Sequence, residues 1–240
     1  MSVHQPADEF PAFFDQAPVL RVHDALAQFL GAAAGGVITY RYVDAVRLAG
    51  HSCPTVAGAY LMVVKGLGHL YADGQLPERG GIEVMMAEGR EDGATGVVAA
   101  VATLLTGAAP ETGFAGIGPA HRFGRRNLLR FDVPMQGVLA LRRLDSGQAV
   151  QVALDASIAP FGDEMRALMP RAVAGAANEQ ELARFAQLWQ ARVKTMLVDE
   201  VNHPQLVQVM PFDESHQAGW RPGQARRAAS RWWARGRAIR

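Results

Sequence analysis

The chain has 240 residues, of which 49% are apolar, and a formal net charge of +1. This composition excludes a disordered chain and is typical of one globular domain with short appendages. No apolar run reaches the ~20 residues needed to cross a bilayer, and the acidic N-terminus lacks the features of a secretory signal. A single cysteine excludes an intramolecular disulfide, so we expect a cytoplasmic protein.

The charge is unevenly distributed. Residues 217–240 contain seven arginines and no acid, so removing their +7 from the net +1 leaves −6 on the rest of the chain. As a helix, residues 223–240 would place Trp232 and Trp233 beside an arginine row. Such a basic amphipathic segment could contact an acidic partner, a membrane surface or nucleic acid, or lie on the acidic core. Only two basic residues are lysines, a composition that resembles the coding bias of GC-rich bacteria.

Hydrophobic periodicity and turn residues divide the chain into an N-terminal arm (1–18), a core domain (19–210) and a basic tail (211–240). In the arm, Phe10, Phe13 and Phe14 are candidates for docking on the core. The elements predicted in chain order are a helix over 19–31, a strand over 37–42 that reads equally well as a helix from 42 to 48, a helix from 54 to about 73, a strand over 81–88, a helix over 97–105, strands over 127–131, 137–142 and 149–154, helices over 161–169 and 179–197, and a short strand within 201–209.

Helices and strands interleave here without the regular alternation of a doubly wound sheet. The predicted fold is therefore α+β, a single mixed domain with a central sheet flanked by helices. Gly58, Gly66 and Gly68 weaken the helix that starts at residue 54, and they also permit close packing against it.

The tripeptide His51-Ser52-Cys53 is the most informative local feature. Pro54 follows it and is favoured at the first position of a helix, so Cys53 is predicted at or beside the N-cap. The positive end of a helix dipole favours a thiolate at that place. In an extended segment, residues two apart point to the same side, so His51 and Cys53 can converge on one ion or one substrate.

The stretch Ala49–Tyr60, with its His-x-Cys-Pro motif, resembles the signature of the FmdE-like family, which takes its name from a component of formylmethanofuran dehydrogenase. Other features follow in the same order: a strand ending at Glu88, a helix closed by Leu105-Thr106-Gly107, and a turn at Asp145-Ser146-Gly147. The resemblance covers roughly residues 20–200 and lacks the C-terminal zinc finger of some members. It implies an α+β core, a homodimer and a bound transition metal, with zinc as the first candidate.

Two ligands do not complete a zinc site, which uses three or four protein ligands. A thiolate and an imidazole suit zinc, copper or iron better than magnesium or calcium. We therefore expect the ligands beyond His51 and Cys53 to come from other side chains, from water or from a second copy of the chain.

Weaker candidates lie elsewhere in the chain. Glu88, at a strand end, and His121, in a loop rich in glycine and proline, are candidate acid–base groups. Arg122, Arg125 and Arg126 in the same loop could hold an anion. Asp44 and Glu83 have less support, and for all of these the alternative is an ordinary surface or structural role.

Three functions remain open from the sequence. The first is a metal-binding protein with a His51/Cys53 site, acting as a small metalloenzyme or as an accessory protein that handles a metal or cofactor. The second is a metal-free thiol enzyme with Cys53 as nucleophile and His51 as base. The third is a non-enzymatic interaction module that uses the basic tail.

Overall fold

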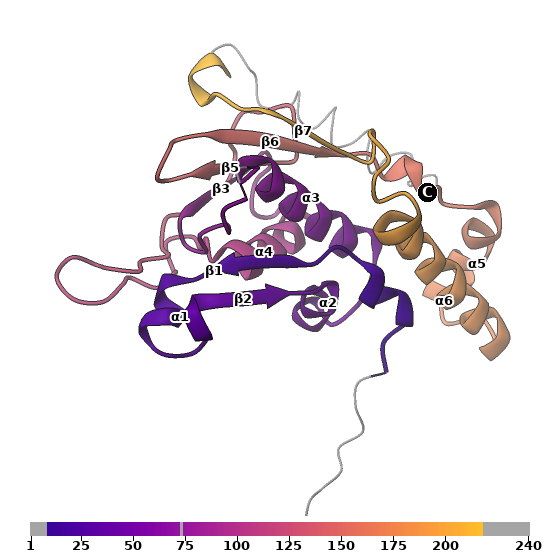
Figure 1. The fold of residues 1–240 in the computed structure, drawn as a ribbon. Helices are drawn as coiled ribbons and strands as arrows, with labels where there is room; N and C mark the ends of the chain where they lie inside the picture. Colours follow the sequence, from indigo (N-terminus) through magenta and orange to yellow (C-terminus); the bar gives the residue numbers. More distant parts are fainter. Residues whose placement is uncertain (1–8, 73, 218–240) are drawn as a thin grey trace, which may run out of the picture.

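The computed structural model describes residues 9–72 and 74–217. It confirms a mixed α+β fold built around one five-stranded sheet (Figure 1). The helices are α1 (Ala25–Phe29), α2 (Tyr42–Ala49), α3 (Pro54–Leu70), α4 (Thr95–Thr106), α5 (Asp163–Val173) and α6 (Glu179–Lys194), and a π-helical turn, η4 (Thr195–Asp199), continues α6. The strands are β1 (Leu20–His23), β2 (Val37–Tyr40), β3 (Ile82–Met86), β4 (Leu129–Arg130), β5 (Leu139–Arg143), β6 (Ala149–Leu154) and β7 (Val207–Pro211). Short 3-10 turns are η1 (Ala12–Gln16), η2 (Ala34–Gly36), η3 (Ala156–Ile158) and η5 (Glu214–Gln217).

Three layers follow one another in Figure 1. The sheet, in the order β4-β3-β5-β6-β7, forms the first layer, and it is antiparallel except for the β3–β4 pair. Helices α3 and α4 pack against its inner face. On the other side of α3 lie α2 and a separate two-stranded sheet formed by β1 and β2. The α5–α6 pair projects to one side.

Helix α3 is the centre of the core. Eleven of its 17 residues are buried, as expected for a helix that is apolar on nearly every side. Gly58 and Gly66 face the sheet: a Cβ atom at Gly66 would lie 2.7 Å from Cδ1 of Leu141 and 3.1 Å from Cγ2 of Val152. The predicted close packing is thus confirmed at these two glycines. The prediction is wrong at Gly68, where an added Cβ atom would meet no other atom within 4 Å.

A smaller core lies on the outer face of the sheet. Its members are Met85, Ala87, Val133, Met135, Ala140 and Phe212. Beside it, Arg130 and Arg142 each pair with both Glu83 and Glu214, at 2.5–3.0 Å. These four charges hold the segment after β7 on the outer face of the sheet.

Most predicted elements are confirmed, with one correction. The helix predicted over 19–31 is wrong in its first half, where β1 pairs with β2 and α1 begins only at Ala25. Leu20 and Val22 are buried while Arg21 is exposed, so a strand alternation was hidden in a run that also fits helical spacing. Asp24 ends the strand and caps α1 by accepting hydrogen bonds from Leu26 N and Ala27 N.

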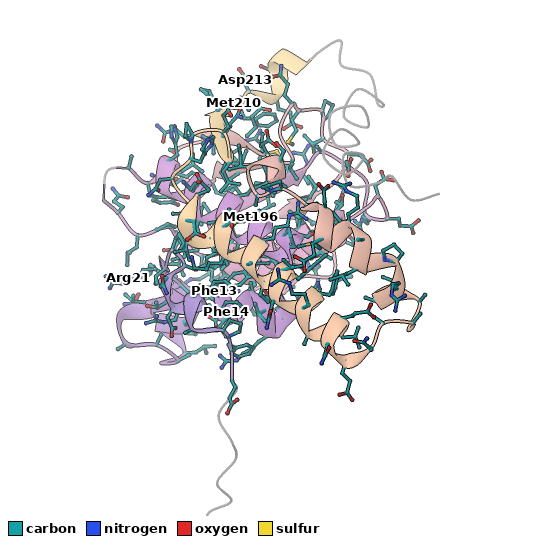
Figure 2. All side chains as sticks on the ribbon, turned by 90° about the vertical axis from the view of Figure 1, so that its right-hand side faces the viewer. Phe13, Phe14, Arg21, Met196, Met210 and Asp213 are labelled. Atoms are coloured by element: carbon teal, nitrogen blue, oxygen red, sulfur yellow. The ribbon has the colours of Figure 1, made fainter. Side chains whose placement is uncertain are left out.

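The N-terminal arm docks as predicted where the structure describes it. Phe14 is buried and meets the Tyr42 ring edge to face at 4.9 Å, and Phe13 packs on Phe14 (Figure 2). The helix predicted for residues 223–240 lies outside the described residues. Within 9–72 and 74–217, no helix combines the length and apolar character required to span a membrane.

We predict that Gly66→Ala destabilises the protein by about 1–3 kcal/mol, because the added methyl group meets two strands that cannot both move away. Gly68→Ala is the matched control, and we expect it to stabilise α3 by about 0.5–1 kcal/mol. Urea unfolding of both variants measures the difference. Equal effects at the two positions would contradict the packing described here.

A second prediction concerns His23, whose ring contacts Glu78 through Nδ1 and Gln28 Oε1 through Nε2 at 2.8 Å. The hydrogen bond to Glu78 and then that to Gln28 raise the pKa of His23 above its ordinary value of 6.5. A raised pKa stabilises the fold below pH 6.5, and this contribution is lost as the pH rises through the folded-state pKa. Because both groups are partly exposed, we expect less than about 1 kcal/mol.

The measurement is the unfolding free energy of wild type and His23→Gln at about pH 5.5 and about pH 8.5, on either side of the transition. We expect the gap between the two proteins to be larger at the lower pH. His69→Gln, at an exposed position of α3, is the control and should show no such change. A gap that grows towards the higher pH would contradict the assignment.

Candidate functional site around Cys53

Cys53 is the N-cap of α3, as the sequence predicts. Its backbone is extended (φ −151°, ψ 168°), Pro54 occupies the first helical position, and Sγ accepts a hydrogen bond from Val56 N at 3.5 Å. The residue is 8% exposed, so the thiol is largely enclosed. It faces backbone N–H groups that have no helical partner of their own.

The residue before it, Ser52, is held from three directions. Tyr42 Oη donates to Ser52 Oγ at 3.0 Å, and Ser52 Oγ donates to Gln190 Oε1 at 3.0 Å. Its carbonyl oxygen accepts from Trp189 Nε1 and from Gln190 Nε2, each at 3.2 Å. Tyr42 is fully buried, and burial raises the pKa of its phenol, so it acts here as a neutral donor. The segment that presents Cys53 is therefore fixed to α2 on one side and to α6 on the other.

Arg192 lies on α6, the helix that also holds Ser52. Burial lowers the pKa of Arg192 from its ordinary value, and a smaller electrostatic contribution from Cys53 raises it. Arg192 Nε donates to the Ala159 carbonyl at 2.7 Å, and the guanidinium lies 5.6 Å from the centre of the Phe161 ring. No ion pair joins Arg192 to an acidic residue of the described chain. The positive charge is thus half-buried without a carboxylate partner.

His51 is on the surface beside this site. Its Nδ1 contacts the Ala49 carbonyl at 2.9 Å, and among the described residues no hydrogen bond joins the ring to Cys53. A histidine whose Nδ1 donates to a carbonyl presents Nε2 outward, an arrangement common among metal-binding histidines. Within 9–72 and 74–217, however, no group of three or more His, Cys, Asp or Glu side chains is placed to hold a metal ion.

The other candidate residues lie in local networks of their own. Thr95 Oγ1 donates to Glu88 at 3.1 Å, at the start of α4. His121 is exposed and contacts the Ala115 carbonyl at 3.1 Å. Asp44 belongs to the N-terminal capping box of α2, and Glu83 to the ion pairs on the outer face of the sheet. None of these contacts reaches Cys53.

The three arginines of the 122–126 loop do not form one cluster. Arg125 is buried, donates to Asp24 at 2.8 Å and also contacts the Arg79 carbonyl. Arg122 stacks over Phe123 at 4.8 Å, while Arg126 is exposed. Arg125 therefore has a structural role, which leaves Arg122 and Arg126 as the arginines of this loop that an anion could reach.

The contributions of α6 to the site were not predicted from the sequence. Trp189, Gln190 and Arg192 carry no local signal that connects them to residues 52 and 53. Only the packing of α6 across the N-terminal end of α3 brings them there. Comparison of the chain with protein-family models and with curated proteins gives no match. The assignment of this site therefore depends on its geometry and on the His-x-Cys-Pro motif.

Proposed function

We propose that the protein is a thiol enzyme in which Cys53 attacks a small anionic electrophile. The observation that carries the proposal is the position of Sγ, which accepts a hydrogen bond from a backbone N–H at the positive end of α3. The segment that presents it is held by α6, which also carries Arg192, a half-buried guanidinium without a carboxylate partner among the described residues. Both favour a negative charge at that point, whether on the thiolate or on a bound ligand. A dication is disfavoured by the same guanidinium.

Each residue has a separate task in this proposal. Cys53 is the nucleophile, Val56 N–H donates a hydrogen bond to its Sγ, and Arg192 orients the anionic group of the substrate. Ser52, held by Gln190, fixes the direction of the thiol. Because the chain has one cysteine, a second thiol of its own cannot resolve the adduct. Attack by Sγ displaces the leaving group of the substrate, which departs with the thiol proton, and water or an external thiol then displaces the substrate fragment from Sγ and restores the thiol. A reducing compartment such as the cytoplasm keeps that thiol free.

The test compares the alkylation rates of Cys53 by iodoacetate and by iodoacetamide, two reagents that differ mainly in charge. We expect Arg192→Gln to lower the ratio of iodoacetate to iodoacetamide rates by roughly fivefold, which corresponds to about 1 kcal/mol for one partly exposed charge. Mass spectrometry of the modified protein gives both rates. Cys53→Ser should show no labelling.

Arg184→Gln is the matched control, because it removes the same charge from α6 at an exposed position that pairs with Glu164. Its rate ratio should equal that of wild type. The thiol proposal fails if Cys53 resists both reagents in folded protein, or if Arg192→Gln leaves the ratio unchanged while its circular dichroism spectrum is native.

Metal binding is the second candidate, and the outward Nε2 of His51 favours it. His51 and Cys53 would supply two ligands, and a second copy of the chain or the substrate would have to supply the others. One described chain does not by itself fit a complete zinc site. The resemblance to the FmdE-like family supports this candidate and, with it, a zinc-bound homodimer, and the predominance of arginine over lysine favours a bacterial source.

For this candidate, we predict that protein purified without added metal contains near-stoichiometric zinc or another transition metal. Cys53→Ser and His51→Ala should each lose most of it without unfolding, as the circular dichroism spectrum would show, whereas His69→Ala keeps it. Elemental analysis measures the content. A chelator separates the two candidates: a metal-bound thiolate reacts with iodoacetamide only after the metal is removed, whereas a metal-free thiol reacts at the same rate throughout.

A further inference from the structure

Strand β7 is an open edge of the central sheet. It pairs with β6 on one side, and no other strand of the described residues lies against its second side. Its sequence, Val-Gln-Val-Met-Pro, carries no charge. Exposed edges are usually protected by charged side chains, by proline or by short length. Here only the proline and the short length protect it.

The hydrogen-bond pattern shows which backbone groups point outward. Phe212 N donates to the Ala149 carbonyl and Asp155 N donates to the Leu206 carbonyl, so the backbone N–H and C=O groups of residues 206, 208, 210 and 212 point towards β6. The backbone groups of residues 207, 209 and 211 therefore point away from β6, towards the open side of the strand. The N–H groups of Val207 and Val209 have no hydrogen-bond partner among the described residues. Unpaired donors and acceptors in a row are a template for another strand.

We propose that β7 pairs in antiparallel register with β7 of a second copy of this chain, about a two-fold axis that passes beside Gln208. Val207 of each copy then lies opposite Val209 of the other copy. In each of these two pairs the residues exchange two backbone hydrogen bonds, so the outward N–H groups of Val207 and Val209 in both copies have carbonyl acceptors. Pro211 selects this register. In the alternative register, centred on Val209, its ring would face the strand of the second copy instead of lying past the end of the ladder.

The side chains are compatible with the same arrangement. Val207 and Val209 belong to the inner face of the sheet, so the two copies would place valines opposite valines next to α3. Gln208 is exposed and, two residues from Met210 along the strand, lies on the same outer face, so it would meet Gln208 of the second copy directly. A neutral edge brings no repulsion between identical copies. Such an interface is smaller than the ~1,200 Å² of stable complexes, so the dimer is weak and forms with increasing concentration.

The experiment is sedimentation velocity of the full chain from about 10 µM to about 1 mM, the range in which a weak interface is populated. We expect wild type to change from monomer to dimer. Gln208→Lys and Gln208→Glu each place like charges directly opposite each other, and each should raise the dissociation constant at least tenfold. An equimolar mixture of the two variants places opposite charges there and should restore the dimer.

Gln187→Lys, which adds the same charge at an exposed position of α6, is the control and should dimerise like wild type. Wild type that stays monomeric, or Gln208→Lys that dimerises unchanged, overturns the proposal. So does a mixture that stays monomeric, which would exclude this register. Slow amide exchange at Val207 and Val209 in a monomeric protein also overturns it, because these N–H groups would then be hydrogen-bonded within one chain. The partner of β7 would in that case be residues 218–240 of the same chain.

Discussion

Burial of α3 between two layers is the constraint on which the rest of the structure depends. A helix that is apolar on nearly all sides is stable only if another element covers each side. The sheet reaches it closely because Gly58 and Gly66 have no side chain. On the opposite side, α2 packs against it and Tyr60 Oη donates to the Tyr40 carbonyl of β2. Its first turn, with Cys53 as the cap, is thereby placed at the edge of the core, where α6 can cross it. The position of the thiol is a consequence of core packing.

Helix α6 contributes to stability and to the site with different faces. Val193 and Trp189 continue the packing of the core, while Gln190 holds Ser52 and Arg192 donates to the Ala159 carbonyl. The arrangement is rigid, because both the hydroxyl group of Ser52 and its carbonyl oxygen have partners. Rigid placement lowers the entropic cost of orienting a nucleophile, but it also leaves little freedom for a ligand set to rearrange around a metal.

Most of the fold could be predicted from the sequence, since strand and helix periods are local signals, and Pro54 marks a helix start that the structure confirms. The strand within residues 19–31 could not be predicted, because four residues are too few to distinguish the two-residue period of a strand from the 3.6-residue period of a helix. At the site, the cap position of Cys53 was predictable from Pro54. The approach of Arg192 was not, because it depends on how two helices far apart in the sequence cross. The burial of Arg125 was hidden for the same reason, since its partner Asp24 lies 101 residues away.

The thiol site and the open edge of β7 use different residues, which decides how the proposals can be tested. Self-pairing of β7 extends the sheet at the strand farthest from β4 and uses only backbone groups of Val207 and Val209. The site of Cys53 uses α2, α3 and α6. Charges introduced at Gln208 should therefore change association without changing the alkylation ratio, and Arg192→Gln should do the reverse. If metal were bound between two copies, the two properties would change together, because a dimer that supplies ligands to His51 and Cys53 must link sheet pairing to the thiol.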